Sequence, residues 1–228
     1  MKSTLEKQKW TKAFQGHSMA YPAEYVIRIF KGTYPRLKLS QNVFTNKKIC
    51  DIGCGDGRNM AFLKTRGFDI YGMEITPEIV DKTRENLRKA GIVDAIIKVG
   101  TNDSIDFKDN FFDYLLSWNS CYYMGEGRDF SLHVREYARI LKKGGWLVLS
   151  IPKKTCFIYK GSRKLKNGYR VILKDPFHVR NGDVLKCFEG EKDIRKNFPN
   201  FKNFIFASVE DDCFGFNYHS YLVVCQKI

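Results

Sequence analysis

The chain has 228 residues, of which 43% are hydrophobic, so it can bury the core of one α/β domain with room for a small insertion. Its net charge of +14 is compatible with nucleic acid, an anionic membrane surface or an anionic small substrate as partner, and equally with lysine-rich genomic usage. No apolar run approaches the roughly 20 residues that cross a bilayer, and the charged N-terminal stretch lacks the apolar core of a signal peptide. The seven cysteines form no C-x-x-C pair and no zinc-type Cys/His cluster. We therefore expect a cytoplasmic protein with reduced thiols, no membrane span and no metal site.

Two short helices are predicted before the first strand, over residues 3–14 and 22–31. Pro22 occupies a first-turn position, and Tyr25, Ile29 and Phe30 indicate an apolar stripe. From there strands and helices alternate, which predicts right-handed crossovers and a mainly parallel sheet. The expected strands cover residues 47–52, 68–73, 95–99, 112–118, 146–151, 204–209 and 220–226. The expected helices between them cover residues 58–66, 76–91, 129–141 and 191–198.

The composition changes after Pro152. Residues 152–174 contain eight basic side chains and no acidic one, with glycines and aromatics between them. Regular elements resume near residue 191. Residues 152–188 are therefore predicted to be a basic segment inserted after the fifth strand, and a solvated surface loop is the simplest alternative.

A glycine-rich turn follows the first predicted strand, in the sequence KICDIGCGDGRN at residues 48–59. Its spacing is Asp-x-Gly-x-Gly-x-Gly, which differs from the Gly-x-Gly-x-x-Gly of dinucleotide folds, and no phosphate-binding P-loop is present. Glycine has no Cβ, so this backbone can lie close against a ligand. Open α/β sheets bind ligands at the carboxyl ends of their strands, which is where Asp51 and the turn lie.

Three further segments follow in a fixed order. Glu74 ends the second strand about 20 residues past the glycine turn, a position from which a carboxylate accepts hydrogen bonds from ribose hydroxyls. The fourth strand lies in DNFFDYLLSWNS, residues 109–120, and the next helix ends in REYARILKKGG, residues 135–145. Together with the glycine turn, these segments resemble the class I S-adenosylmethionine (SAM)-dependent methyltransferases. Lys143 stands where that family usually has proline, and residues 216–227 resemble its final strand.

The resemblance covers roughly residues 40–150 and 201–228. It implies a Rossmann-like, seven-stranded, mainly parallel α/β sheet with an antiparallel last strand and helices on both faces. It also implies a single methyltransferase domain over residues 1–228, with N-terminal helices in residues 1–40 and the inserted segment 152–188 acting as lids.

The cofactor implied by the resemblance is S-adenosyl-L-methionine, with S-adenosyl-L-homocysteine (SAH) as product. Asp51 would serve its amino group, Glu74 its ribose and Ile75 its adenine. An aspartate often follows the third strand near the adenine, but here Thr101 comes directly after Gly100, so the choice among the residues of that loop stays open. The expected cofactor-binding residues are Tyr21, Asp51, Gly53, Cys54, Gly55, Glu74, Ile75, Thr101, Asn102, Asp103 and Ser117.

The sequence after the fourth strand narrows the acceptor. Trp118-Asn119-Ser120-Cys121 lacks the Pro-Pro of N6-adenine and N4-cytosine enzymes and the Pro-Cys nucleophile of RNA cytosine-C5 enzymes. We interpret Cys121 as a packing cysteine. The N-terminal stretch and residues 175–182 instead resemble features of bacterial small-molecule methyltransferases, some linked to cell-surface polysaccharide synthesis.

That resemblance implies that Asn119, Tyr122, Tyr123, His178 and Arg180 face the acceptor. His178 is the predicted general base, because the ordinary histidine pKa of about 6.5 suits proton removal. The alternative is a turn histidine after Pro176 that touches only solvent. His133, on a predicted helix between apolar neighbours, is expected to be structural.

We therefore predict methyl transfer to an oxygen or nitrogen atom of a small, anionic acceptor, with a sugar-nucleotide or polysaccharide-related compound as the compound class that suits the positive charge. Two alternatives stay open. One is an RNA methyltransferase that holds the phosphate backbone with residues 152–174. The other is a non-catalytic SAM-binding subunit that serves a partner. No oligomeric state is predicted.

Overall fold

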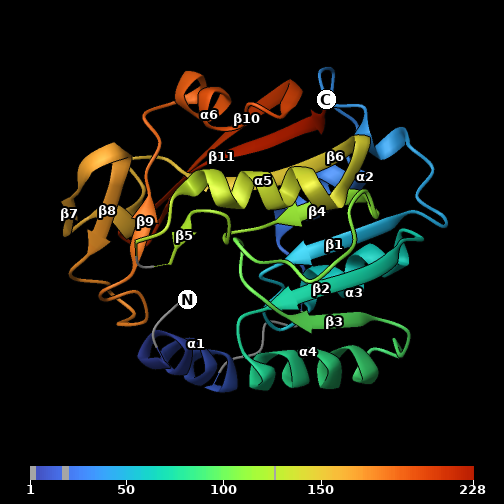
Figure 1. Cartoon of the computed structure of the whole chain (residues 1–228), viewed down its shortest axis with the longest axis horizontal. Coiled ribbons are helices and arrows are strands. Elements are labelled where there is room, and N and C mark those ends of the chain that lie inside the picture. The colour runs from blue at the N-terminus through green and yellow to red at the C-terminus, as the bar shows by residue number, and fades with distance from the viewer. Residues whose placement is uncertain (1–3, 17–20, 126) are drawn as a thin grey trace.

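The structure, a computed structural model, describes residues 4–16, 21–125 and 127–228 (Figure 1). A seven-stranded sheet in the order β10-β11-β6-β4-β1-β2-β3 forms its centre. Strands β1, β2, β3, β4 and β6 pair in parallel, whereas β11 runs antiparallel to both β6 and β10. The predicted Rossmann-like sheet with an antiparallel last strand is confirmed. The strands are β1 (Lys48–Ile52), β2 (Asp69–Glu74), β3 (Ile96–Val99), β4 (Phe112–Ser117), β6 (Leu141–Pro152), β10 (Phe201–Cys213) and β11 (Phe216–Lys227).

Helices cover both faces of this sheet. Buried side chains of α2, α3 and α4 belong to one apolar cluster, and those of α5 and α6 to a second cluster on the opposite face. Helix α4 begins as its sequence predicts, because the Thr76 hydroxyl accepts a hydrogen bond from the Ile79 N–H and Pro77 occupies the first helical position. The helices are α1 (Thr4–Gly16), α2 (Glu24–Lys31), α3 (Arg58–Thr65), α4 (Pro77–Lys89), α5 (Phe130–Ile140) and α6 (Glu191–Asn197).

The inserted segment contains more regular structure than its composition predicts. Residues 152–188 include three short strands, which join a strand that precedes α5 in a second sheet of order β5-β9-β8-β7. This sheet lies on the side toward which the arrowheads of β1, β2 and β3 point (Figure 1). Its strands are β5 (Tyr123–Met124), β7 (Ser162–Lys164), β8 (Tyr169–Ile172) and β9 (Val184–Lys186). Strands of two to four residues carry too few alternations to be recognised in sequence.

The last two strands are longer than predicted. They continue past the sheet as a two-stranded hairpin, in which Asp211 pairs with Tyr218 and Cys213 with Phe216. Because this extension is mostly exposed, its residues lack the apolar pattern from which a strand is recognised. Phe214 and Gly215 at its tip both have positive φ. Among the described residues, no helix combines the length and the apolar character that a membrane span requires.

Candidate functional site

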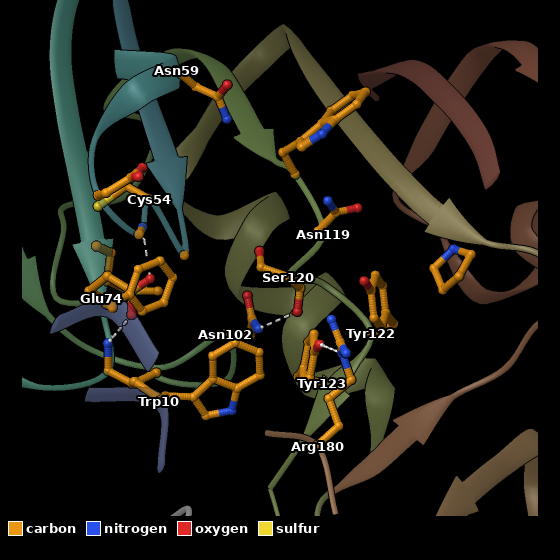
Figure 2. A pocket seen from close by; sticks show the side chains of 18 of the residues that line it. Trp10, Cys54, Asn59, Glu74, Asn102, Asn119, Ser120, Tyr122, Tyr123 and Arg180 are labelled. Atoms are coloured by element: carbon orange, nitrogen blue, oxygen red, sulfur yellow. Dashed lines mark hydrogen bonds between the residues drawn. The ribbon is translucent and has the colours of Figure 1, made fainter. Parts of the chain in front are cut away.

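A cavity of about 290 Å³ opens at the carboxyl ends of β1, β2 and β4, next to the second sheet. Figure 2 shows its two halves: Cys54 and Glu74 lie on one side, and Asn119, Tyr122, Tyr123 and Arg180 on the other. The position agrees with the rule that open α/β sheets bind ligands beyond the carboxyl ends of their strands.

The glycine turn forms the first wall of the cavity. Gly53 and Gly55 have φ angles of 74° and 57°, a region that residues with a Cβ rarely adopt. A Cβ on Gly53 would lie 2.6 Å from the Cβ of Ser120, so this position also has no room for a side chain. The N–H groups of Gly53 and Cys54 donate to the Met73 carbonyl at 2.9 and 3.2 Å, which ties the turn to the end of β2.

Asp51, at the end of β1, lies directly behind this turn. Its side chain is 1% exposed, and neither carboxylate oxygen has a hydrogen-bond partner within the described residues. Burial, assisted by the nearby Glu74 carboxylate, raises the pKa of Asp51 to about 8, although Arg58 partly opposes the rise. A buried carboxyl group without partners is costly, so this position favours a cationic or hydrogen-bond-donating ligand group.

Glu74 lines the cavity from the end of β2. One of its carboxylate oxygens accepts a hydrogen bond from the Gly55 N–H at 2.9 Å, and the other accepts from the Ile75 N–H at 2.8 Å (Figure 2). These bonds hold the side chain against the glycine turn. A carboxylate oxygen can accept more than one hydrogen bond, so this arrangement is compatible with further bonds from ligand hydroxyls.

The loop after β3 contains three residues predicted to bind the cofactor, and two of them line the cavity. Thr101 and Asn102 line the cavity, whereas Asp103 does not: its carboxylate accepts a hydrogen bond from the Thr101 hydroxyl at 2.6 Å and lies 3.4 Å from Arg128. The Asn102 amide donates to the Ser120 carbonyl at 3.0 Å and accepts from the Tyr137 hydroxyl at 2.6 Å. Asn102 is therefore held in one orientation at the cavity wall.

Three other predicted cofactor residues lie outside the cavity lining: Asp51, which is buried behind the glycine turn, Ser117 and Tyr21. Ser117 is fully buried, with its hydroxyl 2.7 Å from that of Ser120, so it supports the wall from behind. Tyr21 is 83% exposed. Gly53, Cys54, Gly55 and Ile75 line the cavity as expected of contact residues.

Helix α1 covers the cavity with two aromatic side chains. The Trp10 ring meets the Tyr123 ring edge to face, with 5.4 Å between centroids. A Cβ on Gly55 would lie 2.8 Å from the Phe14 ring, so Phe14 packs directly on the glycine turn. The helix is attached at both ends of the cavity, because the Thr11 and Thr76 hydroxyls are 3.0 Å apart and Lys9 donates to the Asn181 carbonyl at 2.7 Å.

The far half of the cavity is walled by aromatic rings. Tyr122 and Tyr123 stack with 4.9 Å between centroids, and Phe157 and Tyr218 line the same region. Burial raises the pKa of both Tyr122 and Tyr123, so their hydroxyl groups keep their protons at neutral pH. They can act as hydrogen-bonding groups but are poor bases.

Asn119 and Arg180 place polar groups in this half. The Asn119 N–H donates to the Ser150 hydroxyl at 2.7 Å, and that hydroxyl donates to the Asn119 side-chain oxygen at 2.8 Å. The Arg180 guanidinium donates to the Tyr123 hydroxyl at 2.9 Å and to the buried Asp175 carboxylate at 2.8 Å. Asp175 also accepts from two backbone N–H groups of its own loop, which fixes the loop that presents Arg180.

The predicted general base does not reach the cavity. His178 has an exposed side chain and a φ of 57° in the turn after Pro176, and it is not among the cavity-lining residues. The geometry therefore gives the base assignment no support and corresponds to the alternative, a turn histidine. His133 is buried, with Nδ1 2.9 Å from the Cys121 carbonyl, as expected of a structural histidine. Cys121 is fully buried, and burial raises the pKa of its thiol.

Several lining residues were not predicted from the sequence: Arg58, Asn59, Trp118, Ser120 and Tyr218. Ser120 and Trp118 immediately follow β4, so their position after a central strand was an available signal. Tyr218 comes from the hairpin extension and had no local signal. Within the described residues, no cluster of three or more His, Cys, Asp or Glu side chains could hold a metal ion.

Comparison with known proteins agrees with this geometry. The family model described as "Methyltransferase domain" matches residues 50–149. The uncharacterised methyltransferase YcgJ of Bacillus subtilis is 25% identical over 143 residues, which are 60% of this chain and 52% of that protein. An uncharacterised methyltransferase of Mycobacterium tuberculosis is 28% identical over 103 residues, which are 45% of this chain and 39% of that protein. The matches thus span about half or less of the length of these relatives.

Solved structures share the fold at lower identity. A SAM-dependent methyltransferase from Methanosarcina mazei has a TM-score of 0.67 and 21% identity, covering 86% of this chain and 98% of its own. A protein from Pyrococcus horikoshii has a TM-score of 0.67 and 19% identity, covering 96% and 99%. Residues 50–149 thus match the methyltransferase domain, and the sheet order, the glycine turn and the acidic end of β2 agree with the class I, Rossmann-like fold of these solved structures.

Proposed function

We propose that this chain transfers the methyl group of S-adenosylmethionine to an oxygen or nitrogen atom of a small acceptor. The observation that carries the proposal is one continuous cavity with two chemically different halves. The half at the glycine turn holds carboxylates and backbone groups, and the other half holds aromatic walls with a few fixed polar groups.

The residues of the first half suit the cofactor. The buried Asp51 carboxylate, without partners in the described structure, would receive the ammonium group of the methionine part, directly or through water. Glu74, held by the Gly55 and Ile75 N–H groups, would accept hydrogen bonds from the ribose hydroxyls. Thr101 and Asn102 would lie at the adenine. When bound, the cofactor supplies a methyl group that is already activated for transfer.

The second half would bind and orient the acceptor. Its tyrosine and phenylalanine rings give a flat, apolar chamber, and Asn119, Tyr122 and Arg180 add hydrogen-bonding groups at its edges. Trp10 and Phe14 of α1 would exclude water from the reacting atoms. Positioning and desolvation account for most of the rate in such a transfer, because the donor needs no further activation.

The acceptor half of the cavity gives little support for a protein base that would remove a proton from the acceptor. His178 is on the surface, and the tyrosines at the acceptor end keep their protons. We therefore infer that the acceptor atom enters the cavity in a form that needs no protein base, as a neutral amine or a hydroxyl acidic enough to be ionised already. His178→Ala would then leave the rate of transfer nearly unchanged.

One observation keeps an RNA acceptor as a second candidate. The hairpin of β7 and β8 exposes basic side chains at Arg163, Lys164 and Lys166, and none of them forms an ion pair within the described residues. Exposed lysines of this kind can follow a phosphate backbone. The small aromatic chamber favours a compact acceptor instead.

The decisive experiment incubates the purified chain and methyl-labelled SAM with a cell extract that is then separated into RNA, protein, polysaccharide and small-molecule fractions. Label in the small-molecule or polysaccharide fraction supports the proposal. Label in nuclease-sensitive material supports the RNA candidate instead. SAH binding without label in any fraction would indicate a SAM-binding subunit that lacks its own acceptor.

A further inference from the structure

A second recess lies beside the aromatic half of the cavity. It has a volume of about 250 Å³ and forms between the start of the inserted segment and the tip of the β10–β11 hairpin. Cys156 and Phe157 line both hollows, so these two residues lie between the recess and the cavity. The Phe157 ring is fixed by edge-to-face contacts with Phe216 and Tyr218, at 5.2 and 4.8 Å between centroids.

The polar groups of this recess match an anion. Lys154 and Lys160 supply two ammonium groups, and none of the lining residues is acidic. Asn217 and Thr155, whose hydroxyl lies 2.9 Å from His219 Nδ1, add side chains that can hydrogen-bond, whereas the Tyr159 hydroxyl already donates to the Lys186 carbonyl at 2.9 Å. Lys160 forms no ion pair within the described residues. Lys154 lies 3.3 Å from Glu189, but both side chains are more than half exposed, so the pairing is weak and leaves the ammonium group available.

Besides Glu189, two acidic residues of the neighbouring hairpin have partners of their own, one of them a backbone group of the recess lining. Glu210 pairs with Lys153, and Asp212 accepts a hydrogen bond from the Gly215 N–H at 3.3 Å. The recess also belongs to a segment, residues 152–174, with eight basic and no acidic side chains. Clustered charge of one sign raises the local concentration of ligands of the opposite sign.

We propose that this recess binds a phosphoryl group of the acceptor, while the part of the acceptor to be methylated occupies the aromatic half of the cavity. The inference rests on the proposed function for its second part, because it assigns the methylated part to that cavity. Lysine ammonium groups bind phosphate oxygens as point charges, and a hydroxyl and an amide beside them supply directional bonds. The acceptor class is therefore an organic phosphate or diphosphate with a ring.

The first test measures calorimetric binding of inorganic pyrophosphate to the full chain saturated with SAH. The Lys154→Gln/Lys160→Gln double variant should weaken this binding at least about tenfold, because two charge-assisted contacts are lost. The matched control, Lys164→Gln/Lys166→Gln, removes the same charge from exposed positions of the same segment outside the recess. It should change the affinity less than about twofold. Equal weakening in both variants, or no saturable binding by the unchanged chain, would overturn the proposal.

The second test compares phenyl phosphate with inorganic phosphate. If the recess and cavity act together, phenyl phosphate binds more tightly, and Phe157→Ala reduces its advantage. Equal affinities would mean a site for free phosphate and would overturn the acceptor assignment. SAH affinity, measured separately in each variant, should stay unchanged. Absence of SAH binding to the unchanged chain would count against the proposed function. Absence of phosphate binding, when SAH still binds, would count only against this recess.

Discussion

Asp51 is a residue whose chemistry depends strongly on its surroundings. In the unfolded chain its pKa is near the ordinary 3.8, whereas burial and the nearby Glu74 raise it to about 8 in the folded chain. Between these values the folded state binds a proton that the unfolded state has released. The contribution of Asp51 to stability therefore falls as the pH rises from about 4 to about 8, by roughly 1.4 kcal/mol per pH unit.

The Asp51→Asn variant should remove this dependence. We expect the ligand-free variant to gain stability relative to the unchanged chain as the pH rises from 5 to 8. Urea unfolding at several pH values measures the difference, and Glu78→Gln, at an exposed position of α4, is the control. Parallel stability curves for the Asp51 variant and the unchanged chain would contradict the raised pKa.

Glu74 should carry a large share of the affinity for the cofactor. Glu74→Ala removes the expected bonds to the ribose hydroxyls, so SAM binding should weaken by roughly 1.5–3 kcal/mol, the scale of hydrogen bonds to a charged group. Titration calorimetry measures the change in SAM affinity. Circular dichroism checks that the variant still folds without the hydrogen bonds between Glu74 and the Gly55 and Ile75 N–H groups. Unchanged affinity would refute the ribose assignment.

At the scale of elements, helix α1 is a part of the cavity wall that does not follow directly from the central sheet. It is held by the Thr11–Thr76 and Lys9–Asn181 contacts, and its aromatic side chains complete the cavity. We expect this helix to open at a lower free energy than the sheet, because elements that cover binding sites are commonly among the less stable parts of a fold. The second sheet, by contrast, is built into the domain through β5, which precedes α5.

Phe14→Ala tests whether α1 contributes to cofactor binding. The variant should weaken SAH binding about threefold to tenfold, because one aromatic contact beside the glycine turn is worth about 0.5–1.5 kcal/mol. Calorimetry with Phe204→Ala as control separates this effect from a general loss of stability, since Phe204 lies on β10 and does not line the cavity. Equal SAH affinities of the two variants would mean that α1 makes no contact on which cofactor binding depends.

At the scale of the whole molecule, the net charge of +14 is not by itself evidence for nucleic acid. Many basic side chains are engaged locally, such as Arg139 with Glu136 and Lys142 with Asp113. The cavity itself combines Asp56 and Glu74 with Arg58 and Arg180, so its charges nearly balance. Residues 152–188 have ten basic and two acidic side chains, so they contribute +8 of the net +14, and the rest of the chain contributes the remaining +6.

Salt dependence of acceptor binding should therefore be shallow. A small acceptor with one phosphoryl group should give a slope of log affinity against log salt no steeper than about −2. An RNA strand with six phosphate contacts would give about −4. Binding measured across a series of salt concentrations distinguishes the two, and a steep slope would support the RNA candidate.

The sequence alone determined the sheet, and it predicted the residues that we propose for the cofactor, because those signals are local. Asp51, Gly53, Gly55 and Glu74 stand at the ends of strongly apolar strands, and parallel strands bring their carboxyl ends together.

The acceptor half depends on contacts between distant segments. Trp10 meets Tyr123, Arg180 reaches Tyr123 from a loop fixed by Asp175, and Tyr218 comes from a hairpin extension with no apolar pattern. Only the tertiary structure placed His178 on the surface and Phe157 between two hollows, since a side chain's distance from a site depends on packing that no local pattern encodes.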